Sequence, residues 1–253
     1  MSDARLQAEH LWAGYGHRVV VEDFSCAFRP GEVTVLLGRN GCGKSTLLRA
    51  LGGLLPALKG RVFLDGQDMA AYRPARRAQL LATLPQGRDV PDITARRLVL
   101  HGRFPYLAYP RRYGPAEQAL AEAALARVGI PALADRPLKR LSGGQRQKVY
   151  LAMLLCQDSP VMLLDEPTTY LDIGCQLETW QLCRDLAAQG RTVVAVSHDI
   201  GQSLRYGHRV LLVEQGRLRM DAGPQEAAAS GELERVFGVR IRPVDEDYLI
   251  IAP

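Results

Sequence analysis

The sequence predicts an α/β fold that begins with antiparallel strands and carries a helical subdomain inserted in its core. Non-alternating apolar runs, which are typical of strands buried on both faces, occur at residues 33–37, 161–164 and 192–196. Strand-like runs give way to helical patterns from about residue 87 onward. We therefore expect one domain over residues 1–253, in which residues 87–157 form the helical insertion.

Length, composition and charge narrow the class of protein. The chain has 253 residues, 47% of them hydrophobic, and its apolar runs are shorter than the roughly 18 to 20 residues that span a bilayer. The polar N-terminus lacks a secretory signal, and five cysteines without a C-x-x-C pair favour neither disulfides nor a zinc site, so we expect a soluble protein in the cytosol. The net charge of +5 comes from scattered basic residues, so a nucleic-acid partner is not expected.

The opening segment, residues 6–28, predicts antiparallel strands joined by turns, with a break at Gly14-Tyr15-Gly16. The flanking glycines leave the ring face of Tyr15 uncovered, so this side chain is a candidate for stacking on an adenine base. The alternative is a turn tyrosine that packs on its neighbours.

A glycine-rich loop follows the predicted strand at residues 33–37 and precedes a helix-compatible run at residues 47–55. Its nine residues are Gly38, Arg39, Asn40, Gly41, Cys42, Gly43, Lys44, Ser45 and Thr46. Glycines let backbone N–H groups converge on one point, and the start of the following helix adds unpaired N–H groups and its positive dipole end. Lys44 can then reach the β- and γ-phosphates of a nucleotide, and the Ser45 hydroxyl can coordinate a magnesium ion that bridges them. The pattern therefore predicts a nucleotide-binding P-loop rather than a chance glycine-rich turn.

The chain continues with a predicted strand at residues 60–66, a short basic helix at residues 73–79 and a buried strand at residues 80–84. Gln86 stands at the carboxyl end of the last of these strands, where open α/β sheets bind their ligands. Its amide could contact the metal ion or the attacking water, although a lone glutamine is most often a surface residue.

The helical insertion contains predicted helices at residues 94–100 and 115–128 and a third from residue 143 onward. The third helix opens with Ser142, Gly143, Gly144 and Gln145. Ser142 is a natural N-cap and the two glycines leave the backbone open to close approach, so this is a second helix N-terminus suited to phosphate. Because one ATP needs only one loop of the first kind, the second is most useful if it faces the nucleotide of another subunit.

Acidic residues and a histidine follow the later buried strands. Asp165 is expected to hold the magnesium shell, and Glu166 to orient or deprotonate the attacking water, although adjacent acids can also form a solvated turn. Asp172 is placed for a subunit contact. His198 can hydrogen-bond the γ-phosphate, whereas an isolated histidine is more often structural.

The remaining segments complete the predicted fold. We expect a helix at residues 176–189, a small helix at residues 232–237, and short strands at residues 209–214, 217–222 and 239–251 that cover the sheet.

With these motifs in this order, the chain closely resembles the ATP-binding subunit of ABC transporters over nearly its whole length. By this resemblance the motifs correspond to the A-loop aromatic (Tyr15), Walker A (residues 38–46), the Q-loop glutamine (Gln86), the signature motif (residues 141–145), Walker B (residues 161–165), the catalytic glutamate (Glu166), the D-loop (Leu171-Asp172) and the switch histidine (His198). The resemblance implies hydrolysis of ATP with Mg²⁺, coupled to transmembrane transport. It also implies that two copies sandwich two ATP molecules, each held by the Walker A loop of one and the signature helix of the other.

Residues 101–107 and 163–173 are similar to bacterial importers of iron(III)-siderophore complexes, with haem and vitamin B12 importers as near relatives. This similarity implies permease subunits, indirectly a substrate-binding protein, and a peripheral position on the cytoplasmic face of the inner membrane. We expect the Arg- and Tyr-rich loop at residues 104–113, which includes Arg111 and Arg112, to dock onto the permease. The chain departs from the pattern at Cys42, where alanine or serine is more usual, and at Gly174-Cys175, where bulkier residues are usual.

Two other classes compete with a transporter subunit. Soluble ABC ATPases that act on ribosomes or DNA usually carry two cassettes or a long coiled-coil insertion, and this chain shows neither. A P-loop kinase would leave the signature helix and residues 170–172 without a purpose. The cargo itself, whether iron-siderophore, haem or cobalamin, is not identified by this chain, because a permease and a binding protein would recognise it.

Overall fold

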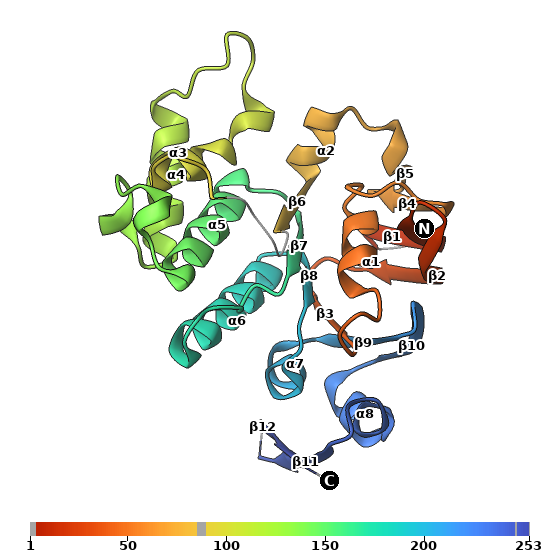
Figure 1. Ribbon diagram of the computed structural model, residues 1–253. Helices are drawn as coiled ribbons and strands as arrows, with labels where there is room; N and C mark the ends of the chain where they lie inside the picture. The colour runs from red at the N-terminus through yellow and green to blue at the C-terminus, as the bar shows by residue number, and fades with distance from the viewer. Residues whose placement is uncertain (1–3, 85–89, 246, 253) are drawn as a thin grey trace.

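The computed structural model describes residues 4–84, 90–245 and 247–252 (Figure 1). A central sheet has the strand order β10 (Arg217–Ala222), β9 (Arg209–Glu214), β3 (Val33–Leu37), β8 (Thr192–Val196), β7 (Val161–Asp165) and β6 (Leu81–Leu84). Strands β9, β3, β8, β7 and β6 are parallel, and only β10 pairs antiparallel, with β9. Parallel pairing brings the carboxyl ends of these strands to one edge of the sheet, which is where ligands of such sheets bind.

A second, antiparallel sheet has the order β2 (Arg18–Phe28), β1 (Leu6–Tyr15), β4 (Lys59–Leu64) and β5 (Gln67–Asp68). Helix α1 (Lys44–Leu51) lies between it and the central sheet (Figure 1). The antiparallel strands predicted for residues 6–28 are confirmed, but the turn falls after Tyr15, which ends β1.

Helices cover the other face of the central sheet. Helices α3 (Ala95–His101), α4 (Pro115–Arg127) and α5 (Gly143–Gln157) form one group, next to α6 (Ile173–Ala188) and α7 (Ile200–Tyr206) (Figure 1). Successive residues of β3 point to opposite cores: Val35 packs into the core with these helices, whereas Leu36 packs into the core with α1 and the antiparallel sheet. All residues of β3, β7 and β8 are buried, which explains why their sequences are apolar without alternation.

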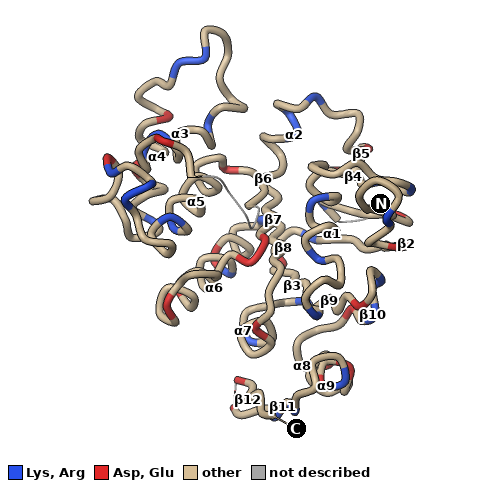
Figure 2. Tube along the Cα trace, viewed as in Figure 1, with Lys and Arg blue, Asp and Glu red and all other residues tan. Residues whose placement is uncertain are grey.

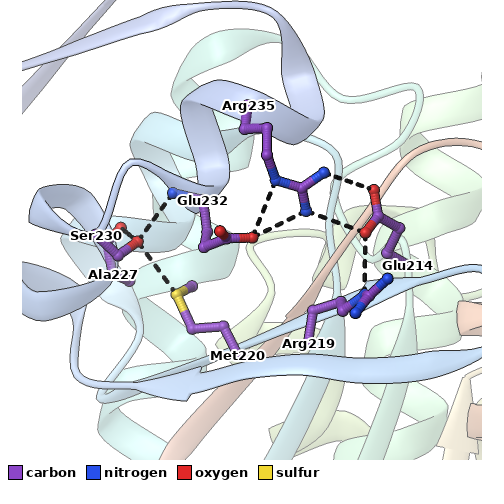
Figure 3. Close-up of polar contacts among 7 residues, drawn as sticks. All are labelled: Glu214, Arg219, Met220, Ala227, Ser230, Glu232 and Arg235. Atoms are coloured by element: carbon purple, nitrogen blue, oxygen red, sulfur yellow. Dashed lines mark hydrogen bonds and ion pairs between the residues drawn. The ribbon is translucent and has the colours of Figure 1, made fainter.

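The C-terminal region consists of α8 (Pro224–Ala229), α9 (Glu232–Phe237) and a hairpin of β11 (Arg240–Val244) and β12 (Asp247–Ile251). Arg235 of α9 donates to both carboxylate oxygens of Glu214 on β9, at 3.2 and 3.0 Å, and also to Glu232 (Figure 3). Arg219 of β10 donates to the same Glu214 at 3.1 Å, and the arginine partners lower the pKa of the Glu214 carboxyl. This charge network links α9 to β9 and β10, while Leu233 and Val236 of α9 pack into the core.

Two sequence predictions differ from the structure, and two short helices were not predicted. Strands β9 and β10 extend the central sheet rather than cover it, because the apolar middle of β9 is buried beside β3. Helix α1 begins at Lys44, inside the glycine-rich stretch, and ends at Leu51 before Gly52-Gly53, so it is shorter than the predicted run at residues 47–55. Helix α2 (Pro74–Leu80) was predicted, but the short helices α7 and α8 were not.

No helix among the described residues combines the length and the apolar character that a membrane span requires.

Candidate nucleotide-binding site

The glycine-rich loop connects the carboxyl end of β3 to the N-terminus of α1. Gly38, Gly41 and Gly43 have φ angles of 155°, 79° and 106°, in the region that favours glycine. A Cβ atom on Gly38 would lie 2.2 Å from the Val213 carbonyl oxygen, so the loop cannot pack against β9 with a side chain there. Gly43 is the N-cap of α1 and supplies no side-chain acceptor, which leaves the first N–H groups of the helix to bind an anion.

Lys44 is 7% exposed, and its ammonium donates to the carbonyl oxygens of Gly38 at 2.7 Å and Arg39 at 3.1 Å. These bonds hold the cation inside the curve of the loop, where a phosphate bound by the N–H groups of α1 would also meet it. The Cys42 sulfur lies 3.9 Å from the same ammonium. Cys42 therefore belongs to the inner wall of the loop rather than to its open side.

Two side-chain oxygens that suit a hard cation, those of Ser45 and Asp165, lie next to each other beside the loop. The Ser45 hydroxyl donates to Oδ1 of Asp165, the last residue of β7, at 3.1 Å. Burial raises the pKa of Asp165, and the Ser45 hydrogen bond partly opposes this shift. Mg²⁺ is commonly held by one or two protein oxygens together with phosphate oxygens and water, so this donor set fits the ion.

A cavity of about 540 Å³ opens in front of the loop. It is lined by Val20, Asn40, Gly41, Gly43, Lys44, Ser45, Thr46, Glu166 and His198. The structure thus brings Glu166 and His198 from the ends of β7 and β8 to the phosphate loop, as the sequence predicts. Val20 on β2 is a wall residue that the sequence analysis missed, because its place depends on how the antiparallel sheet packs.

Glu166 has φ of 51°, a sparsely populated conformation for a residue other than glycine. Its Oε2 accepts a hydrogen bond from the Thr169 hydroxyl at 3.0 Å. The side chain is therefore held at the cavity wall by the turn that follows β7.

The second helix N-terminus lines a different cavity. Ser142 caps α5 by accepting from the Gln145 N–H at 3.2 Å, and the Gln145 side chain accepts from the Ser142 N–H at 3.1 Å, which completes a capping box. This cavity, of about 780 Å³, is lined by residues that include Ser142, Gly143, Gly144, Gln145, Tyr170, Leu171, Asp172 and Cys175. Its lining shares no residue with that of the first cavity, so one chain does not bring together the two helix starts that the sequence predicts to bind phosphate.

Tyr15 and Asp172, two further predicted site residues, do not line the first cavity. Tyr15 is 47% exposed, and its hydroxyl accepts from Arg49 at 3.3 Å, which places it near α1 but outside the lining. Asp172 lines the second cavity as the N-cap of α6, and the hydrogen bond from the Cys175 N–H lowers its pKa. Gln86 lies outside the described residues. Stacking by Tyr15 and metal contact by Gln86 therefore stay predictions.

A P-loop at the carboxyl edge of a parallel sheet, with a buried aspartate beside it, defines the class of P-loop nucleoside triphosphatases. The chain belongs to the ABC transporter family, whose family model matches residues 21–169. It binds ATP and is an ATPase of this family.

Three relatives illustrate the match. The ferric enterobactin transport ATP-binding protein FepC of Escherichia coli (strain K12) is 38% identical over 97% of this chain and 91% of that protein. The hemin import ATP-binding protein HmuV of Rhodococcus jostii (strain RHA1) is 40% identical over 95% of this chain and 82% of that protein. The solved structure of cbiO1 from Clostridium perfringens, part of the ABC transporter complex cbiONQ, has a TM-score of 0.78 at 28% identity and covers 92% of this chain and 94% of that chain.

Alkylation of Cys42 is expected to weaken ATP binding. An adduct on its sulfur must displace Lys44 or the loop backbone, and the loss of one charged hydrogen bond corresponds to roughly a tenfold rise in Kd. The measurement is ATP affinity before and after treatment with N-ethylmaleimide near neutral pH.

Two variants control this test. Burial raises the pKa of Cys26 and Cys156 to about 11 and that of Cys183 to about 12, so these thiols should react slowly. The Cys42→Ser protein should keep its ATP affinity after treatment, whereas Cys175→Ser should remain sensitive. Equal sensitivity of the wild type and Cys42→Ser would contradict the placement of Cys42.

Proposed function

We propose that this chain is the ATP-hydrolysing subunit of a bacterial importer that takes up an iron(III)-siderophore chelate through a separate permease. The observation that carries the cargo is the agreement of several relatives whose names give ferric enterobactin, achromobactin and siderophore transport, at 36–38% identity over 96–100% of the chain. The hemin import relative keeps haem as a second candidate, with cobalamin as a third. The protein would then work as a peripheral protein on the cytoplasmic face of the inner membrane.

Groups that line the first cavity or lie beside it carry the proposed chemistry. The N–H groups of α1 and the Lys44 ammonium bind the β- and γ-phosphates. Ser45 and Asp165 are the residues that would hold Mg²⁺, which when bound neutralises charge on the phosphate oxygens. Glu166 orients a water for in-line attack on the γ-phosphorus and accepts its proton, while the bond to the β–γ bridging oxygen breaks. His198, which also lines this cavity, donates to the γ-phosphate.

The second cavity acts on the nucleotide of another copy. The separation of the two linings within one chain supports a sandwich in which Ser142 and the N-terminus of α5 bind the γ-phosphate held by the partner's loop. Charge-assisted hydrogen bonds to that phosphate join the two copies, and cleavage removes the cross-link. Hydrolysis therefore opens the dimer.

We also propose that residues 87–157 work as one subdomain that carries motion from the nucleotide to the permease. The loop between α3 and α4 projects from this group of helices and carries basic residues (Figures 1 and 2). Its base is fixed, since the Tyr106 hydroxyl donates to the Gln157 carbonyl oxygen at 2.8 Å. Its tip is open, with Tyr109 96% exposed and the Arg111 guanidinium 4.7 Å from the centre of the Phe104 ring. A fixed base and an exposed, basic aromatic tip suit a docking contact.

Glu166→Gln is expected to abolish turnover. The amide keeps the size of the side chain but cannot accept the proton, so kcat should fall by about 10² to 10⁴ while ATP binding persists. Steady-state ATPase assays and size-exclusion chromatography with ATP should show an inactive protein that remains dimeric. Turnover at the wild-type rate would show that Glu166 does not have this role.

Charge reversal of the projecting loop is expected to uncouple transport from ATP binding. Arg111→Glu/Arg112→Glu protein should bind ATP normally but support little uptake, because the docking contact is lost. The matched control is Arg240→Glu/Arg242→Glu, which makes the same charge change at exposed positions of β11. Uptake that is unchanged in the first variant, or equally reduced in both, argues against docking by this loop.

Growth on single nutrient sources tests the cargo. A strain that lacks this protein should fail to use an iron(III)-siderophore as its only iron source and should recover when the gene is restored. Haem use and cobalamin-dependent growth should be unaffected. A defect confined to haem or to cobalamin would replace the siderophore as the cargo and leave the ATPase assignment intact.

A further inference from the structure

Two glutamine side chains connect the walls of the two cavities without lining either of them. Gln176 lies on the first turn of α6, and its Nε2 donates to the Leu171 carbonyl oxygen at 3.0 Å. Gln202 lies on the first turn of α7, and its Nε2 donates to Oε1 of Gln176 at 3.1 Å. The two amides thus form a continuous hydrogen-bonded path from α7 to Leu171.

The α7 end of this path lies beside His198. Asp199, the next residue, caps α7: its Oδ1 accepts from the Gln202 N–H at 2.9 Å. The Asp199 N–H in turn donates to the Ser197 hydroxyl at 3.1 Å. The position of Gln202 is therefore tied to the short segment that carries His198 into the first cavity.

The Leu171 end of the path lies on the N-terminus of α5. A Cβ atom on Gly144 would be 3.1 Å from the Tyr170 carbonyl oxygen and 3.5 Å from Cδ2 of Leu171. Leu171 and Tyr170 therefore pack directly on the helix start that is proposed to bind the partner's nucleotide. A displacement of this segment must change the second cavity.

The polar side chains of Gln176 and Gln202 cost folding stability, which argues against a role in stability alone. Oε1 of Gln202 is buried and meets no hydrogen-bond donor within the described part of the chain. A buried acceptor without a partner costs about 1 to 3 kcal/mol, and two apolar side chains of the same size would avoid that cost.

We propose that Gln176 and Gln202 are positioning residues that couple the His198 segment to the Tyr170–Leu171 segment. A γ-phosphate that draws His198 toward the first cavity would pull, through the two amides, on the residues that shape the second cavity. This inference rests on the proposed roles of His198 and of the second cavity in the ATP sandwich.

The test uses the full chain and a double-mutant cycle of Gln176→Met, Gln202→Met and both together. Methionine keeps the approximate volume and removes the hydrogen bond. Each single variant should lower kcat by roughly three- to tenfold, the worth of one hydrogen bond, with the KM for ATP unchanged. The Tm of each single variant should fall by only a few degrees, because one polar group of the pair loses its partner. The double variant should be no slower than either single one, because both substitutions break the same path.

Two further variants sharpen the result. Gln181→Met removes a hydrogen bond from Gln181 to Asp185, 2.9 Å long, on the exposed face of the same helix, and should keep wild-type kcat. Gln202→Leu has a similar size and no hydrogen-bonding group, so it should show the same loss as Gln202→Met and replaces it if that protein does not fold.

The coupling is overturned if the Gln176 and Gln202 variants keep wild-type kcat, or if their effects multiply in the double variant. It is also overturned if the double variant, which leaves neither amide of the pair unpaired, recovers wild-type kcat together with wild-type Tm. A failure of the proposed function has a different signature, since Glu166→Gln would then remain active whatever the glutamine variants show.

Discussion

The parallel hydrogen bonding of β3, β8 and β7 is the constraint on which the rest of the structure depends. It fixes the carboxyl ends of three buried strands at one edge of the sheet, so the residues that follow each strand must lie close together. The phosphate loop follows β3, Glu166 follows β7 and His198 lies just beyond β8. The sheet is buried on both faces, which makes this edge rigid and holds the Ser45 and Asp165 oxygens 3.1 Å apart.

The fold also gives the N-termini of α1 and α5 different capping and places them at different cavities. Helix α1 opens at a glycine and leaves its N–H groups free of side-chain caps, whereas α5 opens at a serine that is closed into a capping box. In the proposed sandwich, the first arrangement would surround an anion, and the second would present an ordered hydroxyl and backbone N–H groups to an anion that is already bound. The two face separate cavities, and in the proposed sandwich each chain would contribute two halves of a site rather than one complete site.

Most residues of the two cavities could be predicted from the sequence, because they stand at strand ends and helix starts, whose positions follow from local sequence patterns. Glycines at residues 38 to 43, the Ser142 cap and the acids after residues 161–164 each occupy a strand end or a helix start that the apolar pattern already locates. Features that depend on long-range packing could not be predicted. Val20 lines the cavity only because β2 folds against the loop. Strand β9 enters the central sheet only because it pairs with β3, and the paired residues are far apart in the sequence: Thr34 and Arg209, for example, are separated by 175 positions. The Gln176–Gln202 contact is of the same kind, since neither residue belongs to a recognisable motif.

The most direct measurement of the central claim is a structure of the Glu166→Gln protein with ATP and Mg²⁺. The account predicts a dimer in which the Ser142 hydroxyl and the first N–H groups of α5 lie within hydrogen-bond distance of the γ-phosphate bound to the partner's Lys44. A structure in which both nucleotides are fully bound by one chain each, with the start of α5 remote from either triphosphate, would contradict it.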